Sequence, residues 1–151
     1  MNRIFVSLLL IFFSFCYSQD SVTERAASFN IEDHLALEGY DPVSYFEGEK
    51  PVKGSKQYSA NYKGVVYRFC DEESKNKFLL NPTKYEPAYG GWCAYAMGAK
   101  AKKVSVDPET FKIIDGKLNL FYNSFFNNTL KSWNKDEQNL KEKAAENWLK
   151  F

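Results

Sequence analysis

The segment Tyr89–Ala96 places a single thiol, Cys93, behind a glycine pair and between two aromatic side chains. The glycines allow a left-handed backbone or a close approach to another group, and the small residues that follow favour a buried helix. A cysteine at the start of that helix meets unpaired N–H groups and the positive end of the helix dipole, which lower a thiol pKa from about 8.5 toward roughly 7 or below. The segment therefore predicts a chemically active thiol or, because free cysteines are often buried, an inert packing residue.

Soft metal ligands are scarce, since the chain has three cysteines and one histidine. A metal site must use nearly all of Cys70, Cys93 and His34, or recruit oxygen ligands. His34 precedes an apolar segment, where a surface or capping role is the alternative. The chain has 20 Lys and Arg against 19 Asp and Glu with no basic stripe, which does not favour a nucleic-acid partner. A lone histidine also gives little support to hydrolase chemistry, and we expect a protein that is not an enzyme.

Residues 1–18 are predicted to be a signal peptide. Arg3 precedes the apolar run Ile4–Phe15, which is too short to span a bilayer comfortably. Cys16 permits a lipoprotein interpretation, although the preceding phenylalanine is not the small residue that such signals prefer. We therefore expect an exported protein, periplasmic or secreted, with no stable membrane anchor after cleavage and two cysteines left where disulfides are permitted.

A polar lead-in, residues 19–34, is followed by one domain over residues 35–151, which is long enough to bury a core. Two β-rich runs, Tyr58–Tyr62 and Val65–Cys70, flank a Lys-Gly turn and predict a β-hairpin. Asp71 then precedes acidic residues suited to a helix N-terminus, and this helix should end at an Asn-Pro pair.

The second half of the chain first shows three short strand patterns and then helical ones. The strand patterns predict a meander of Val104–Val106, Phe111–Ile114 and Leu118–Tyr122. Two C-terminal helices should follow, the second capped by Asp136 and the first presenting apolar residues on one face, namely Phe125, Phe126, Leu130 and Trp133. The predicted fold class is α+β, with small antiparallel hairpins and a meander packed against short helices.

Four segments share their order and spacing with a known family. They are GYDPVSYF at 39–46, YRFC at 67–70, KFLLNP at 77–82 and YGGWCAY at 89–95. Over about residues 35–149 the chain resembles exported YHS-domain proteins. Short YHS modules are generally regarded as metal-binding, so the resemblance implies a metal-handling protein, with copper as the best guess and zinc as the alternative.

The family's cysteine positions are only partly kept. The short modules carry a cysteine after Asp-Pro-Val, where this chain has Ser44, and a Cys-x3-Cys pair, where it has Cys70 and Ser74. A hydroxyl is a far poorer ligand for Cu(I) or zinc than a thiolate. The metal site expected here is therefore centred on Cys93, with Cys70 and His34 as further ligands.

Two other functions stay open. Some relatives look like selenoproteins, and selenium at the position of Cys93 would imply a thiol redox protein or sensor in which Cys70 resolves the oxidised sulfur. Alternatively the chain is a structural or small-molecule-binding module without chemistry. Its pocket candidates are the carboxylate and aromatic residues Tyr40, Asp41, Tyr45, Trp92 and Tyr95, although aromatic rings fill cores equally well.

Overall fold

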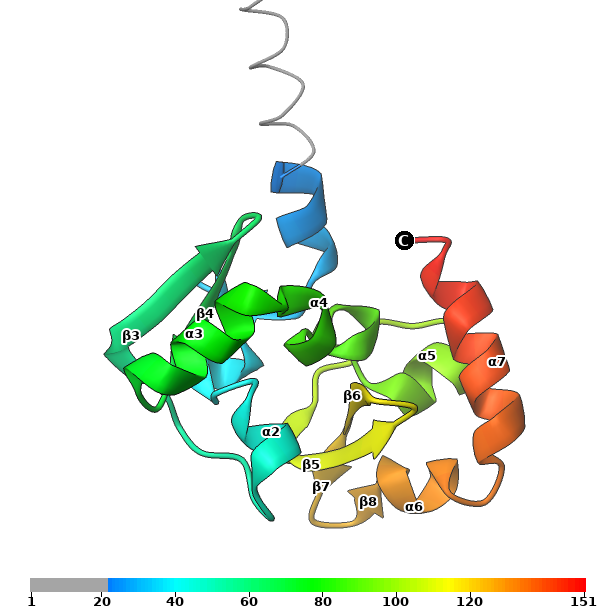
Figure 1. Cartoon of the computed structure of the whole chain (residues 1–151). Helices are drawn as coiled ribbons and strands as arrows, with labels where there is room; N and C mark the ends of the chain where they lie inside the picture. The colour runs from blue at the N-terminus through cyan, green and yellow to red at the C-terminus, as the bar shows by residue number, and fades with distance from the viewer. Residues whose placement is uncertain (1–21) are drawn as a thin grey trace, which may run out of the picture.

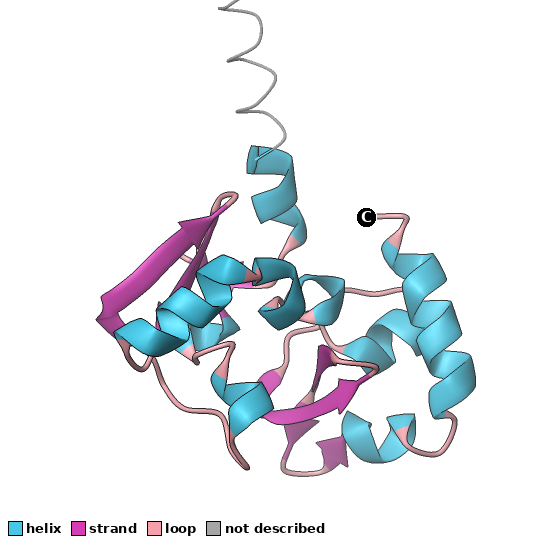
Figure 2. Cartoon of the chain, viewed as in Figure 1, coloured by secondary structure: helices cyan, strands magenta, loops and turns pink. Residues whose placement is uncertain are grey.

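The computed structural model describes residues 22–151 and has the α+β fold predicted from the sequence (Figures 1 and 2). The predicted signal peptide, residues 1–18, lies outside the described residues. Residues 22–28 are helical and packed, where the sequence predicted a loosely held lead-in.

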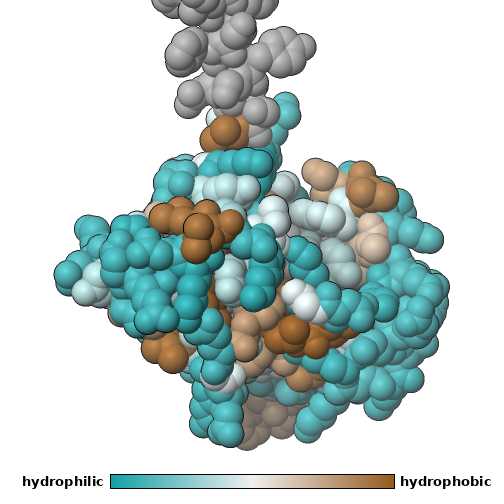
Figure 3. All heavy atoms as spheres, in the orientation of Figure 1, coloured by the Kyte–Doolittle hydropathy of each residue, from teal (hydrophilic) through white to brown (hydrophobic). Residues whose placement is uncertain are grey.

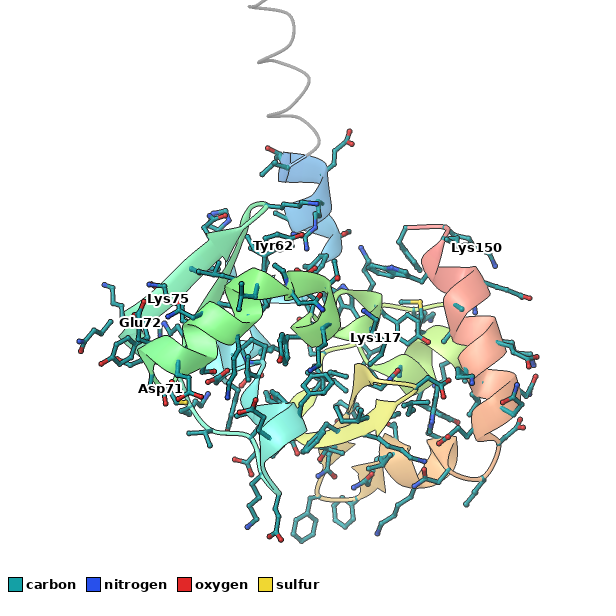
Figure 4. All side chains as sticks on the ribbon, in the orientation of Figure 1. Tyr62, Asp71, Glu72, Lys75, Lys117 and Lys150 are labelled. Atoms are coloured by element: carbon teal, nitrogen blue, oxygen red, sulfur yellow. The ribbon has the colours of Figure 1, made fainter. Side chains whose placement is uncertain are left out.

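Arg25 fixes this first helix to the rest of the domain. Its guanidinium forms an ion pair with Glu86 and donates to the carbonyl oxygen of Tyr62 at 3.1 Å. Tyr62, labelled in Figure 4, is the last residue of a strand. The guanidinium also lies 4.4 Å from the ring centroid of Phe29. These contacts explain why a segment that looks polar in the sequence is ordered.

The first sheet has the strand order β1-β2-β4-β3, in which β2 and β4 are parallel and the other pairs antiparallel. Its strands are β1 (Ile31–Glu32), β2 (Leu35–Ala36), β3 (Ser55–Tyr62) and β4 (Val65–Phe69). The predicted hairpin is confirmed as β3–β4. Lys63 and Gly64 both have positive φ, 49° and 87°, which is the backbone of the turn that best fits the twist of a two-residue hairpin.

Short helices cover this sheet and join it to the second half of the chain. They are η1 (Leu37–Gly39), α2 (Ser44–Glu47), α3 (Glu72–Leu80) and α4 (Pro82–Tyr85). The predicted cap of α3 is confirmed, because the Asp71 carboxylate accepts from the backbone N–H of Ser74 at 2.8 Å. Phe78 of α3 is buried against Tyr67 and Phe69 of β4. This contact forms the centre of the first core.

The second half differs from the prediction in two places. It contains η2 (Ala88–Gly91), α5 (Ala94–Lys100), β5 (Asp107–Ile114), β6 (Lys117–Phe121), β7 (Asn123–Ser124), β8 (Asn127–Asn128), α6 (Thr129–Trp133) and α7 (Glu137–Trp148). The predicted three-stranded meander is a two-stranded hairpin, β5–β6, because Val104 lies outside the strands and its carbonyl accepts from Cys93 N–H at 2.9 Å. The predicted helical positions of Phe125 and Phe126 are wrong. These residues form the turn between β7 and β8.

The two C-terminal helices otherwise follow the prediction. Helix α6 begins after Asn128, whose side chain accepts from two backbone N–H groups of the first turn. Helix α7 begins after Asp136, which occupies the predicted cap position but makes no side-chain cap hydrogen bond. Helix α7 packs along α5, on the right of Figure 1. Trp133, Met97 and Phe121 are fully buried beside these helices and form a second core. None of the helices in residues 22–151 is long and apolar enough to cross a bilayer.

Candidate functional site

A pocket of about 270 Å³ lies where α2, the end of β4 and the first turn of α3 meet. All three positions at which the YHS resemblance expects cysteine line it, namely Ser44, Cys70 and Ser74. Asp41 lines the same pocket and is fully buried. The turn before α2 therefore brings Asp41 to residues that lie about thirty positions later in the chain.

The Asp41 carboxylate is the hydrogen-bonding centre of this pocket. One oxygen accepts from the backbone N–H of Val43 at 2.8 Å. The other accepts from the backbone N–H of Cys70 at 3.0 Å and from the hydroxyl of Ser74 at 2.5 Å. Three donors on three segments thus compensate the burial of one carboxylate, and Asp41 ties the turn to β4 and α3.

Ser44 is also fully engaged. Its hydroxyl donates to the carbonyl oxygen of Asp41 at 2.7 Å and accepts from the backbone N–H of Val52 at 2.9 Å. Among the described residues, no buried side-chain nitrogen or oxygen lacks a hydrogen-bond partner. The two serines that replace family cysteines therefore serve the hydrogen-bond network of the pocket wall.

Cys70 is the exposed thiol of the pocket. It donates to the Asp71 carboxylate at 3.6 Å, at the start of α3 where Figure 4 labels Asp71. Desolvation, followed by the carboxylates of Asp41 and Asp71, raises the pKa of the Cys70 thiol to about 11. The thiol is therefore protonated at neutral pH, because nearby negative charge disfavours the thiolate.

Cys93 lies at the predicted helix N-terminus, but its thiol is not exposed to solvent as a chemically active thiol would be. It is the N-cap residue of α5, and the preceding Gly90 and Gly91 have positive φ, as their type suggests. Its side chain is 0% exposed. Its sulfur accepts from the backbone N–H of Tyr122 at 3.3 Å and lies 3.4 Å from the Thr129 hydroxyl oxygen. The arrangement is that of a packing cysteine.

The three predicted metal ligands are not brought together. Cys70 and Cys93 are both free, so they form no disulfide. His34 is exposed and lines a different cavity, of about 790 Å³, beside the first helix. In residues 22–151 no group of three or more His, Cys, Asp or Glu side chains is arranged to hold a metal ion.

The aromatic pocket candidates do not surround Asp41 either. The hydroxyl of Tyr40 donates to Glu109 at 2.7 Å, and this bond is the largest of the effects that raise the Tyr40 pKa to about 12. The buried hydroxyl of Tyr45 donates to the Pro108 carbonyl oxygen at 2.9 Å.

Trp92 and Tyr95 lie on the other side of the domain, against the second core. Trp92 lines a separate cavity of about 310 Å³, and its indole N–H donates to the carbonyl oxygen of Ser28 at 2.7 Å. Of the predicted pocket residues, only Asp41 lies in the pocket of Cys70.

The charged rim of the Cys70 pocket was not predicted from the sequence. Glu47 and Glu73 line it together with Asp71, and Lys77 forms ion pairs with both glutamates at 2.9 and 3.0 Å. A signal was present in the sequence, because Glu47 lies three residues after Ser44 and Glu73 directly precedes Ser74.

Comparison with known families decides the affiliation. The family model of the YHS domain matches residues 43–89, which span α2 through η2 and include Ser44, Cys70 and Ser74. Residues 43–89 are therefore a YHS domain. No curated protein and no solved structure matches the chain significantly. YHS domains as a family are assigned a metal-binding role, which does not specify the metal.

The donor atoms in the Cys70 pocket fit part of that metal-binding role. One thiol and two serine hydroxyls do not fit a thiolate cage, and the buried Asp41 carboxylate already accepts three hydrogen bonds. One metal–sulfur bond at Cys70, supplemented by the exposed carboxylate of Asp71, does fit the chemistry of these groups.

The raised Cys70 pKa predicts a slow reaction with alkylating agents. Relative to a thiol of pKa 9.0, a pKa of about 11 lowers the thiolate fraction at pH 8 roughly 100-fold. The higher intrinsic nucleophilicity of a more basic thiolate offsets about tenfold of this. We expect iodoacetamide to label Cys70 about tenfold more slowly than unfolded protein, with a rate that rises up to pH 11.

Mass spectrometry of the labelled peptides measures this rate for each cysteine. Asp71→Asn should accelerate labelling of Cys70, since it removes one of the carboxylates that disfavour the thiolate. A Cys70 rate equal to that of the unfolded chain at pH 8 contradicts the assigned environment.

Proposed function

We propose that this YHS-domain protein is exported and binds a metal ion, copper in the first place, through Cys70 rather than Cys93. The observation that supports the proposal is the position of Cys70. It is the accessible thiol of residues 22–151, and it lies in the pocket that gathers the family's ligand positions. Asp71 is the second residue that we expect to contact the metal.

Electrostatics supports a cation in this pocket. Four carboxylates line it, from Asp41, Glu47, Asp71 and Glu73, against the ammonium groups of Lys50 and Lys77. An excess of negative charge around a thiol attracts cations and, once a metal replaces the thiol proton, the same carboxylates stabilise the bound ion. The carboxylates of Glu47, Glu73 and Asp71 are exposed, and the two glutamates would exchange their ion pairs with Lys77 for contacts with the bound ion.

Nothing in the described residues favours the thiol redox alternative. Cys93 is sealed from solvent, and Cys70 has a raised pKa where a redox-active cysteine has a lowered one. Cys93 is also not among the residues that line the Cys70 pocket.

The test is an anaerobic titration of the purified protein with Cu(I) and with Zn(II). We expect stoichiometric Cu(I) binding in the wild type, with an affinity at least tenfold lower in Cys70→Ser and unchanged in Cys93→Ala. The proposal fails if no stoichiometric binding occurs or if Cys70→Ser binds as the wild type does. Loss of binding in Cys93→Ala alone, with an unchanged circular dichroism spectrum, would return the site to Cys93.

Expression of the full chain for this titration also tests export. The proposal expects the purified protein to begin near Gln19, so its intact mass should lack residues 1–18. Protein recovered from the cytoplasm at full mass would contradict export without bearing on the metal.

A further inference from the structure

The tip of the β7–β8 hairpin consists of two exposed phenylalanines. Ser124 pairs with Asn127 across the hairpin, so Phe125 and Phe126 are the two central residues of its turn. Each is 93% exposed, and their rings contact one another edge to face with centroids 4.7 Å apart. They form one small apolar knob at the end of the molecule.

Folding does not explain this knob. Two-residue hairpin turns favour glycine, asparagine and aspartate, and neither Phe125 nor Phe126 has the positive φ that such turns use. The hairpin is held instead by bonds on its far side, where Thr129 N–H and hydroxyl both donate to the Tyr122 carbonyl oxygen, at 3.0 and 2.8 Å. The two rings contribute almost no buried surface to the folded chain.

The sequence around the knob is uncharged or basic. Four polar uncharged residues flank it, Asn123, Ser124, Asn127 and Asn128. From Gly116 to Lys135 the sequence has three lysines and no acidic residue, and Lys131 of the following helix is exposed.

One carboxylate contacts this hairpin, that of Asp107 in β5. It accepts from the Asn123 amide at 3.2 Å and is further satisfied by the Thr110 hydroxyl at 2.7 Å. Insertion of the two rings into an apolar environment would therefore desolvate no charge in the turn itself.

We propose that Phe125 and Phe126 dock reversibly on an anionic lipid surface, with both rings in the bilayer interface and the exposed Lys131 of the following helix near the headgroups. A convex knob of two side chains is far smaller than the roughly 1,200 Å² that a stable protein interface buries. A bilayer needs no complementary cavity, and aromatic side chains and lysines are the groups that prefer its interface. The charge of the segment favours anionic headgroups.

Other exposed apolar residues do not form a comparable tip. Leu80, 87% exposed, stands at the end of α3, and Leu149, 86% exposed, follows α7. Figure 3 shows apolar residues in separate patches on a mostly hydrophilic face. Leu80 lies beside the half-exposed Leu79 on a helix, and exposed leucines of this kind are ordinary on protein surfaces, which makes Leu80 a control.

The test is co-sedimentation with vesicles of phosphatidylcholine alone or with about 30% phosphatidylglycerol, because anionic lipid strengthens interfacial binding. It uses the chain from Gln19 onward, because residues 1–18 carry an apolar run of their own and residues 22–151 form the folded unit. We expect binding to anionic vesicles that weakens in high salt. The double variant Phe125→Ser/Phe126→Ser should lose at least tenfold in partitioning, and Leu80→Ser should keep it.

A second measurement places the tip itself. In Phe126→Trp, anionic vesicles should shift the added tryptophan emission to the blue, and brominated lipids should quench it. The proposal is overturned if the wild type stays in the supernatant, if the double serine variant binds equally, or if quenching is absent. A soluble protein partner captured by the tip while vesicles are ignored would equally overturn it. No metal enters these experiments, so they stand apart from the Cys70 proposal.

Discussion

Replacing Gly98 by alanine is expected to lower the free energy of unfolding by about 3 kcal/mol, through overpacking between two helices. Gly98 lies in α5 where α7 crosses it. A Cβ atom at this position would lie 2.5 Å from the carbonyl oxygen of Leu140 and 3.2 Å from its carbonyl carbon. Both atoms belong to the α7 backbone and cannot rotate away, so the helices must separate and the packing around Met97 must open.

Thermal and urea denaturation measure this effect. For a domain of this size, about 3 kcal/mol corresponds to a fall in Tm of roughly 6–12 °C. Gly116→Ala is the matched control, because Gly116 has a φ of 72° but nothing within 4 Å of the added methyl group. It should cost only the left-handed backbone penalty of about 1 kcal/mol. If Gly98→Ala were no less stable than Gly116→Ala, the close approach of α5 and α7 would be wrong.

Local signals predicted the elements that depend on neighbouring residues. The Lys63-Gly64 turn, the Asp71 cap and the placement of Cys93 at a helix terminus are each decided within about four residues. Turn and cap geometry act over that distance, so their residue types are informative by themselves.

The wrong predictions concern segments whose structure depends on contacts with residues distant in the sequence. Val104 was expected in a strand, but its carbonyl serves the N–H of Cys93 instead of a neighbouring strand. Phe125 and Phe126 fit a helical apolar face by type, yet the helix starts at Thr129, after the side chain of Asn128 caps it. Apolar residues at helical spacing indicate a helix only if they are buried, and the spacing alone does not show whether they are.

The site was predictable as a set of positions and not as an arrangement. The YHS resemblance marks Ser44, Cys70 and Ser74, and Asp41 was among the pocket candidates. Their convergence depends on bonds from Asp41 to residues 29 and 33 positions away. The burial of Cys93 depends likewise on Tyr122 and Thr129, 29 and 36 positions away. Neither separation leaves a local trace in one sequence.

Asp41→Ala is expected to lower the free energy of unfolding by about 3–5 kcal/mol, the largest effect of any single change in the Cys70 pocket. The substitution leaves three donors without their acceptor, the N–H groups of Val43 and Cys70 and the Ser74 hydroxyl. The hydroxyl can rotate to another acceptor, but the two backbone groups cannot. Chemical denaturation measures the loss.

Asp41→Asn separates hydrogen bonding from shape. Its amide oxygen can still accept, while its NH2 group must face a donor, so we expect a smaller loss of about 1–3 kcal/mol. Asp71→Ala is the control, since it removes the α3 cap and the long contact with the exposed Cys70 thiol, and it should cost about 1 kcal/mol. An Asp41→Ala variant as stable as Asp71→Ala would show that the carboxylate does not hold the pocket together. The backbone N–H of Cys70 is one of the three donors to Asp41, so the carboxylate also fixes the position of the proposed metal ligand Cys70. Copper affinity should therefore fall in Asp41→Asn even where the protein remains folded.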